Sequence, residues 1–129
     1  MRIVPIIVIS ALLSSGHALA HHSFSAEFDS EKPITLSGKI TRMQWSNPHG
    51  WIYIDVANED GTVTNWALET RAANSLIRRG WRRDDLPAGT PIVVNGFEAR
   101  NGTPTANIQS ITLEDGRNFM SGNADEVPN

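Results

Sequence analysis

Hydrophobic and polar residues alternate with a period of two along most of the chain after residue 33, which is the pattern of β-strands that bury one face. The clearest case is Trp51–Asn58, where Ile52, Ile54 and Val56 share one side. The alternation predicts five strands, over Ile34–Trp45, Trp51–Asn58, Thr62–Glu69, Thr90–Ala99 and Thr105–Leu113. We therefore expect a protein built mainly from one antiparallel sheet.

Two local features refine this pattern. The alternation changes phase near Thr41 or Arg42, inside the first strand, and a β-bulge would explain the change. The pair Asp60-Gly61 separates the second and third strands and is typical of a tight hairpin turn. The second and third strands should thus form a hairpin.

A helical period replaces the alternation between the third and fourth strands. Ala72, Leu76 and Ile77 recur at helical spacing, Thr70 can serve as the N-cap, and Gly80 stands where a C-cap glycine belongs. The order β-β-β-α-β-β predicts an all-β fold with one helix, a small OB-fold-like five-stranded barrel. An open α+β sheet and a small sandwich are the structural alternatives.

The first 20 residues have the pattern of a secretory signal peptide, with Arg2, an apolar stretch over Ile3–Leu13, and Ala18-Leu19-Ala20 as the cleavage motif. We expect export to a periplasm, or secretion, and no later segment is apolar enough to span a bilayer. The expected organisation is a signal peptide over 1–20, an N-terminal extended segment over 21–33, the barrel over 34–117 and a flexible tail over 118–129.

Composition narrows the possible functions. The 129-residue chain has a formal net charge of −3, and because Arg2 is the only charged side chain in the signal, the mature chain keeps 10 basic and 14 acidic side chains, or −4. Cysteine is absent, which excludes disulfides and thiolate metal sites and leaves histidine, carboxylate and methionine as metal ligands. The negative charge and the expected export argue against nucleic acid as a partner.

Three histidines survive removal of the signal, and they suggest a copper site. Cleavage after Ala20 would make His21 the first residue, so its α-amine and imidazole could chelate one ion, and a further histidine would complete a three-nitrogen brace. Copper(II) favours such nitrogen ligands. In an extended segment His22 would share a face with Phe24 and Phe28, and His21 would lie on the other face, so one of the pair is expected to join His49.

Other interpretations of these residues stay open. Cleavage after Ala18 would place His21 third and create a different copper chelate that needs no fold. His49, in Trp45-Ser46-Asn47-Pro48-His49-Gly50-Trp51, could simply hydrogen-bond within a tight turn. Glu69 is a secondary candidate, either as a carboxylate ligand or as a hydrogen-bond acceptor for a histidine. Its simpler interpretation is an exposed carboxylate at a strand end.

A second functional hypothesis needs no metal. The loop face around Trp45, Asn47, Trp51 and Arg82 could bind a protein or another ligand of the cell envelope. Arg82 belongs to the only basic cluster, residues 78–83, which Asp84 and Asp85 offset. We find no Gly-x-Ser-x-Gly turn and no phosphate-binding glycine loop, so a binding module is favoured over an enzyme.

The mature chain also carries a series of short blocks: H-H-S-F with E-F-D, then T-L-S-G, W-S-N-P-H, W-A-L-E, R-G-W after the helix, and N-G-T-P with E-D-G-R. The series resembles an uncharacterised domain-of-unknown-function family of exported bacterial proteins and covers nearly all of the mature chain. The resemblance implies export and one compact β domain. It implies no activity and no ligand.

Overall fold

The computed structural model describes residues 24–122, so His21, His22, the expected signal peptide and the end of the expected tail lie outside the described residues. The strands are β1 (Phe28–Gln44), β2 (Gly50–Ala57), β3 (Val63–Thr70), β4 (Pro91–Ala99), β5 (Thr105–Leu113) and β6 (Asn118–Met120). The helices are α1 (Phe24–Glu27), α2 (Ala73–Arg78) and a 3-10 turn, η1 (Arg83–Asp85).

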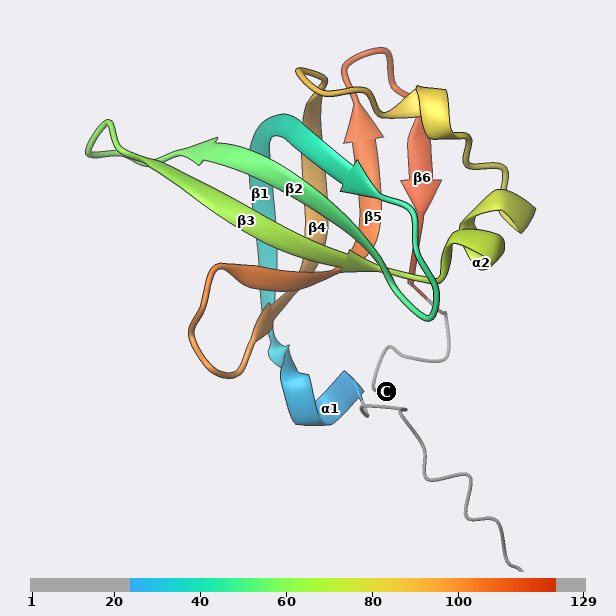
Figure 1. Cartoon of the computed structure of the whole chain (residues 1–129). Helices are drawn as coiled ribbons and strands as arrows, with labels where there is room; N and C mark the ends of the chain where they lie inside the picture. Colours follow the sequence, from blue (N-terminus) through green and yellow to red (C-terminus); the bar gives the residue numbers. More distant parts are fainter. Residues whose placement is uncertain (1–23, 123–129) are drawn as a thin grey trace, which may run out of the picture.

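The sheet closes on itself to form a small barrel (Figure 1). Its order is β3-β2-β1-β4-β5-β6, and a parallel pairing of β3 with β5 joins the two sides. The predicted all-β barrel, with a helix between the third and fourth strands, is confirmed, but the sheet has six strands rather than the predicted five, because β6 adds to β5. The connectivity favours the OB-fold-like interpretation, which stays a prediction about fold family.

β1 supports the closure because its two halves pair with different strands. Its first half pairs with β4 and its second half with β2, and the register shifts between Ile40 and Arg42 in the pairing with β2. This shift is the bulge that the sequence predicts. A bulge increases the local bend and twist of a strand, which lets one strand of 17 residues serve both sides of the barrel.

One continuous hydrophobic core fills the barrel. Its buried residues are Leu36, Ile40, Ile52, Ile54, Leu68, Leu76, Trp81, Leu86, Ile92, Val94, Ala106, Ile108, Ile111 and Leu113. Leu76 and Trp81 come from the segment between β3 and β4, so this segment covers one side of the barrel. The chain has no cysteine and therefore no disulfide. Its folded state thus depends on the burial of this core.

The predicted helix is present, but its predicted N-cap is wrong. α2 begins at Ala73 with Ala72 as N-cap and no side-chain capping hydrogen bond. Thr70 is the last residue of β3, is 2 % exposed, and donates its hydroxyl hydrogen bond to the carbonyl of Arg71. Gly80 has φ +95° just after the helix, a conformation that glycine adopts easily, as expected of its place.

Both ends of the barrel domain differ from the expected organisation. β1 already starts at Phe28, so much of the segment 21–33 belongs to the sheet, and residues 24–27 form a short helix rather than an extended chain. At the other end the turn at Asp115-Gly116 folds β6 back onto β5, and Ser121 is buried. Phe119 anchors β6 by packing edge-on against Trp81, with ring centroids 5.3 Å apart.

We call residues 24–29 the N-terminal arm. Phe24 and Phe28 lie one helical turn apart with ring centroids 5.7 Å apart, and Phe24 also meets Phe97 of β4 edge-on at 5.7 Å. Phe28 is 3 % exposed. The arm is therefore packed against the outside of the barrel. None of the helices within residues 24–122 has the length and apolar character required to cross a membrane.

Candidate functional site

The loop between β1 and β2 brings His49 to one end of the barrel. Ser46 donates its hydroxyl hydrogen bond to the carbonyl of His49 at 2.6 Å, and the peptide between Asn47 and Pro48 is cis. The His49 side chain does not bond within the turn. Instead its Nδ1 lies 2.8 Å from Oε1 of Glu69 in β3, and the two side chains are 41 % and 9 % exposed.

The register of three strands explains why Glu69 meets His49. Trp51 pairs with Glu69 across β2 and β3, so alternation places the side chains of His49, Trp51 and Glu69 on the same face. The parallel pairing with β5 sets Asn107 beside Glu69. Glu69 is therefore covered, and its interpretation as an exposed strand-end carboxylate is wrong.

Gly50 allows the close approach of the loop to β3. A Cβ at this position would lie 2.6 Å from Oγ1 of the buried Thr70 and 3.2 Å from the carbonyl of Arg71. The backbone of Gly50 in turn donates to that carbonyl at 3.1 Å. The small residue after His49 thus lets the loop dock where its imidazole can reach Glu69.

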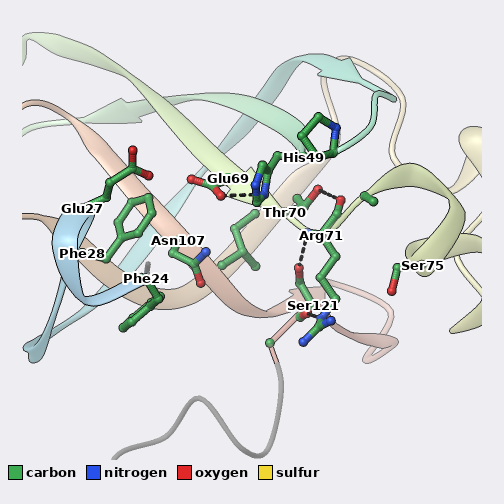
Figure 2. A pocket seen from close by; sticks show the side chains of 14 residues that line it. Phe24, Glu27, Phe28, His49, Glu69, Thr70, Arg71, Ser75, Asn107 and Ser121 are labelled. Carbon is green, nitrogen blue, oxygen red and sulfur yellow. Dashed lines mark hydrogen bonds and ion pairs between the residues drawn. The ribbon is translucent and has the colours of Figure 1, made fainter. Parts of the chain in front are cut away.

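The pair lies at the wall of a cavity of about 340 Å³ (Figure 2). The arm forms another part of this wall through Phe24 and Phe28, and Glu27 also borders it. Because Phe24 is the first described residue, the segment that carries His21 and His22 joins the described chain at the rim of this cavity. Phe24 and His49 thus border the same cavity.

A second part of the wall holds the C-terminal end of the described chain in place. Arg71 donates from Nε to the carbonyl of Ser121 at 2.6 Å and from its backbone to the hydroxyl of Ser121 at 3.3 Å. Arg79 donates from Nη1 to the carbonyl of Gly122 at 3.3 Å. These contacts fix Ser121 and Gly122 against the cavity.

The chemistry of the pair is that of a histidine oriented by a carboxylate. A carboxylate accepts from an imidazole N–H, which sets the tautomer and leaves the other ring nitrogen to act as a ligand. Glu69 occupies Nδ1, so Nε2 is the nitrogen of His49 available to a metal ion. Within residues 24–122 no group of three or more histidine and acidic side chains could hold a metal ion.

Trp51 lines a neighbouring cavity of about 460 Å³ rather than the one beside His49. The far wall of this cavity consists of Arg100, Asn101, Thr103 and Thr105, at the turn between β4 and β5. Glu27, Phe28 and Glu69 border both cavities. The two cavities are therefore adjacent hollows that share one wall.

The other residues of the predicted loop face lie elsewhere. Trp45 packs against the core, and the guanidinium of Arg83 lies 5.6 Å from the centre of its ring. Asn47 is exposed, and its side-chain oxygen accepts from the backbone of Asn74 at 3.4 Å. The structure places neither of them with Trp51, although all three belong to the same stretch of sequence.

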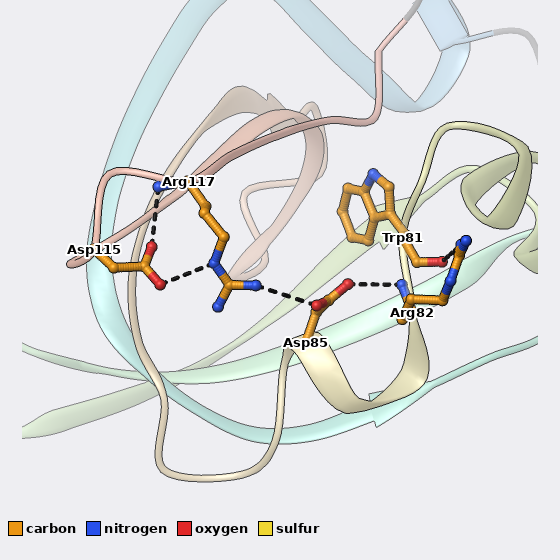
Figure 3. A network of polar contacts seen from close by, with 5 residues as sticks. All are labelled: Trp81, Arg82, Asp85, Asp115 and Arg117. Carbon is orange, nitrogen blue, oxygen red and sulfur yellow. Dashed lines mark hydrogen bonds and ion pairs between the residues drawn. The ribbon is translucent and has the colours of Figure 1, made fainter.

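Arg82 follows α2 in the chain and belongs to a network of polar contacts around η1 (Figure 3). Its backbone donates to Oδ2 of Asp85 at 2.8 Å, and its guanidinium turns back to the carbonyl of Trp81 at 3.0 Å. Asp85 also accepts from Arg117, whose Nε bonds Asp115 at 2.8 Å. The network ties η1 to the turn before β6.

The sequence alone does not indicate that several residues of the His49 cavity belong to a site. Asn107 and Ser121 look like ordinary polar positions, and they reach the cavity because β3 pairs with β5 and because β6 folds back. Arg71 follows the strand end directly. A parallel pairing across the barrel is a long-range feature, so alternation within single strands could not reveal it.

Comparison with known proteins places the chain in a family but adds no ligand. A search of curated proteins found no match. The model of a family of unknown function (DUF6152) matches residues 9–108, which is well over half of the chain. The resemblance noted from the short sequence blocks is therefore confirmed, and the chain belongs to the family of unknown function DUF6152.

Proposed function

We propose that this protein is an exported copper-binding module in which His49 and an N-terminal histidine hold the metal ion. The signal-peptide pattern of residues 1–20 supports export and a new N-terminus at His21. The ion would bind at the cavity between the β1–β2 loop and the N-terminal arm. Metal handling or sensing in the periplasm is the role that such a module would serve.

The observation that carries the proposal is the 2.8 Å contact between His49 and Glu69. Metal-binding histidines usually donate their second ring N–H to a carboxylate, a carbonyl or water, which orients the ring and raises its basicity. Glu69 is largely buried while His49 is partly exposed toward the cavity. The imidazole is thus held by a largely buried partner at Nδ1, which leaves Nε2 as the ring nitrogen for a metal ion.

His21 and His22, the other proposed ligands, are close in sequence to Phe24. Consecutive Cα atoms are 3.8 Å apart, so the Cα atoms of His22 and His21 lie at most about 8 and 11 Å from that of Phe24. Phe24 itself borders the cavity that contains His49. Both histidines are therefore attached to the chain within three residues of this cavity, which supports a place for either of them in the site.

Copper fits this set of ligands better than other metals. An α-amine, the imidazole of the same residue and Nε2 of His49 supply three nitrogens, and copper(II) binds nitrogen sites most tightly among the divalent first-row ions. Cysteine ligands, which would favour zinc or iron–sulfur clusters, are absent from the sequence. His22 replaces His21 as the imidazole donor in a variant of the same proposal.

A metal-free binding module is the second candidate, and the cavity beside Trp51 supports it. A volume of about 460 Å³ is within the range of small-molecule sites. Trp51 offers a half-buried aromatic surface, and Arg100 offers a cation. An envelope ligand with a flat apolar face would suit this cavity and would need neither His21 nor His49.

Copper titration of the processed protein separates these candidates. Wild type, His21→Ala, His22→Ala and His49→Ala are each titrated with copper(II) in competition with a chelator of known affinity, and Asn47→Ala serves as a control in the same loop. We expect His49→Ala and one of the two N-terminal changes to weaken binding strongly. Asn47→Ala should bind like wild type.

The same series of variants identifies the copper chelate that would form if the signal peptide were cleaved after Ala18. A chain that starts at Leu19 and binds copper through its first three residues would keep its affinity in His49→Ala and lose it in His21→Ala. That result, or an absence of tight binding in wild type, would refute the folded site. The metal-free module would then be the better account.

A further inference from the structure

The cavity beside Trp51 lies on the outside of the barrel and has walls from three parts of the chain. These parts are the N-terminal arm, the strands β2 and β3, and the turn between β4 and β5. Ile52 and Leu68 belong to the core, so their neighbours Trp51 and Glu69 face away from it. The copper proposal uses neither Trp51 nor the turn, so this cavity needs an account of its own.

Trp51 gives the cavity a flat aromatic wall. Among the described residues that border the cavity, Trp51 and Phe28 are aromatic, and Phe28 is only 3 % exposed. The half-buried indole of Trp51 is therefore the ring on which a ligand can stack. The face of an aromatic ring carries partial negative charge and attracts the polarised C–H groups of a flat apolar surface.

Arg100 and Asn101 supply hydrogen-bond donors that the protein already holds in place. Nε of Arg100 donates to the carbonyl of Ser25 at 2.8 Å, and Nη1 lies 3.4 Å from Oδ2 of Asp29. Oδ1 of Asn101 accepts from the backbone and the hydroxyl of Thr103 at 3.1 and 2.7 Å. Within residues 24–122 these contacts leave Nη2 of Arg100 and the side-chain nitrogen of Asn101 as donors to a ligand. Side chains that are already ordered lose less conformational entropy on binding.

The wall of the cavity carries charges of both signs. Glu27 and Glu69 contribute carboxylates, and Arg100 contributes a guanidinium. Glu69 lies 2.8 Å from His49, and Arg100 lies 3.4 Å from Asp29. A small anion would meet the two carboxylates, and a small cation would meet the guanidinium. A neutral ligand whose groups both donate and accept hydrogen bonds suits this wall better than an ion of either sign.

We infer that this cavity binds a pyranose ring of a saccharide, with the apolar C–H face of the ring on Trp51 and its hydroxyl groups bonded to Arg100, Asn101 and Glu27. Sugar hydroxyls both donate and accept, so they can use the guanidinium, the amide and the carboxylate together. The inference rests on the second candidate function, the metal-free binding module, and gives that module a class of ligand. It needs no metal ion and no residue outside residues 24–122.

Saccharide binding can be followed by proton–nitrogen correlation NMR of the processed protein after metal is removed with a chelator. The probes are maltose, cellobiose and chitobiose, and the comparison compounds are sorbitol and choline. Sorbitol has sugar hydroxyls but no ring face, and choline is an organic cation that suits an aromatic wall. We expect a disaccharide to shift the indole N–H signal of Trp51 and the amides of residues 100–105 until saturation, and the comparison compounds to shift neither.

The length of the saccharide distinguishes two sources of the ligand. The methyl glycoside and the hexasaccharide that correspond to the tightest disaccharide are titrated in the same way. Equal affinities would identify a small free sugar as the ligand. An affinity that grows with chain length would identify a glycan, and either result supports a pyranose site.

Two variants of the cavity and one control connect binding to the named residues. Trp51→Ala should raise the dissociation constant about tenfold or more, because the stacking surface is lost. Asn101→Asp keeps the oxygen that holds the turn but lacks the amide donor, so it should weaken binding several-fold while the barrel stays folded. Tyr53 lies on the same face of β2, outside the cavity, with the guanidinium of Arg42 4.0 Å from the centre of its ring. Tyr53→Ala should bind like wild type.

The outcomes separate this inference from the copper site. If no saccharide shifts the named signals, or if sorbitol or choline shifts them as strongly, the inference is overturned. Unchanged affinity in both Trp51→Ala and Asn101→Asp, or an equal loss in Tyr53→Ala, would overturn it as well. A protein that binds copper through His49 but no saccharide refutes this inference alone. A protein that binds saccharide but no copper refutes the copper site alone.

Discussion

The carboxylate of Glu69 lies beside the imidazole of His49, with 2.8 Å between Oε1 of the carboxylate and Nδ1 of the ring. The two residues are 20 positions apart and come from different elements, a loop before β2 and the end of β3. Their meeting depends on the pairing of Trp51 with Glu69 and on the absence of a side chain at Gly50. The site is thus built into the register of the sheet.

Replacing Glu69 by glutamine should weaken copper binding while the barrel stays folded. Glutamine has nearly the same shape but lacks the charge that makes the His49 imidazole a stronger ligand, and losses of about 10–100-fold are typical of such changes. Competition titration measures the effect, with Glu59→Gln as a control at an exposed turn. His49→Ala should cost more than Glu69→Gln, and the reverse order would contradict the assigned roles.

Copper binding should weaken as the pH falls from 8 to 5. The α-amine of an N-terminal His21 must lose its proton to bind copper, and with an ordinary pKa of about 7.7–8.0 only about one such amine in a thousand is deprotonated at pH 5. Dissociation constants measured across this range should therefore rise by two orders of magnitude or more. A chain whose α-amine at His21 is acetylated cannot form this chelate and should bind weakly at every pH.

Gly50→Ala should destabilise the barrel and disturb the His49 loop. The added Cβ would lie 2.6 Å from Oγ1 of Thr70, so the start of β2 must shift, and overpacking of this kind costs about 1–3 kcal/mol. Urea denaturation measures the change. The double variant Gly50→Ala/Thr70→Ala should lose less stability than the two single changes together, because it removes the closest atom. Strict additivity would contradict this explanation.

The turn before β6 should make a pH-dependent contribution to the stability of the folded state. Hydrogen bonds from the backbone and side chain of Arg117 lower the pKa of Asp115 below its ordinary value. A carboxyl whose pKa is lowered by folding stabilises the folded state above its unfolded pKa, and this contribution is lost as the pH falls through the folded pKa. Because Asp115 is exposed, we expect a small effect on stability.

Arg117→Ala should raise the pKa of Asp115 part of the way toward its ordinary value, because the backbone hydrogen bond of residue 117 remains and only the side-chain contact is removed. NMR titration of the carboxyl groups can follow the change. Asp60 is a suitable control, because hydrogen bonds from Thr62 lower its pKa at the opposite hairpin. Its titration should not change in Arg117→Ala. An unchanged titration of Asp115 would show that the side-chain contact at 2.8 Å does not persist in solution.

The sequence allowed much of the barrel to be predicted because its signals are local. Alternation located five strands, a phase change located the bulge between Ile40 and Arg42, and Asp60-Gly61 and Gly80 marked a turn and a helix end. Such features arise from neighbouring residues and from backbone preferences. They survive in the folded protein because the tertiary contacts agree with them.

Features that depend on distant contacts were missed. Thr70 has the side chain of a typical N-cap, but the closure of β3 onto β5 buries it and turns its hydroxyl to Arg71. In the sequence Glu69 resembles an exposed carboxylate, but the pairing of β3 with β5 sets it beside Asn107, and it is buried. The partnership of His49 with Glu69 was named only as one option, since no spacing along the chain encodes it.

The most direct test of the copper site is a native intact mass spectrum of the protein isolated from the periplasm after growth with copper. One spectrum reports both the first residue and any retained metal ion. We predict a chain that begins at His21 and carries one copper ion, and a His49→Ala protein that begins at the same residue without it. A chain that begins at His21 and is free of metal, or a His49→Ala protein that retains copper equally well, would contradict the proposed site.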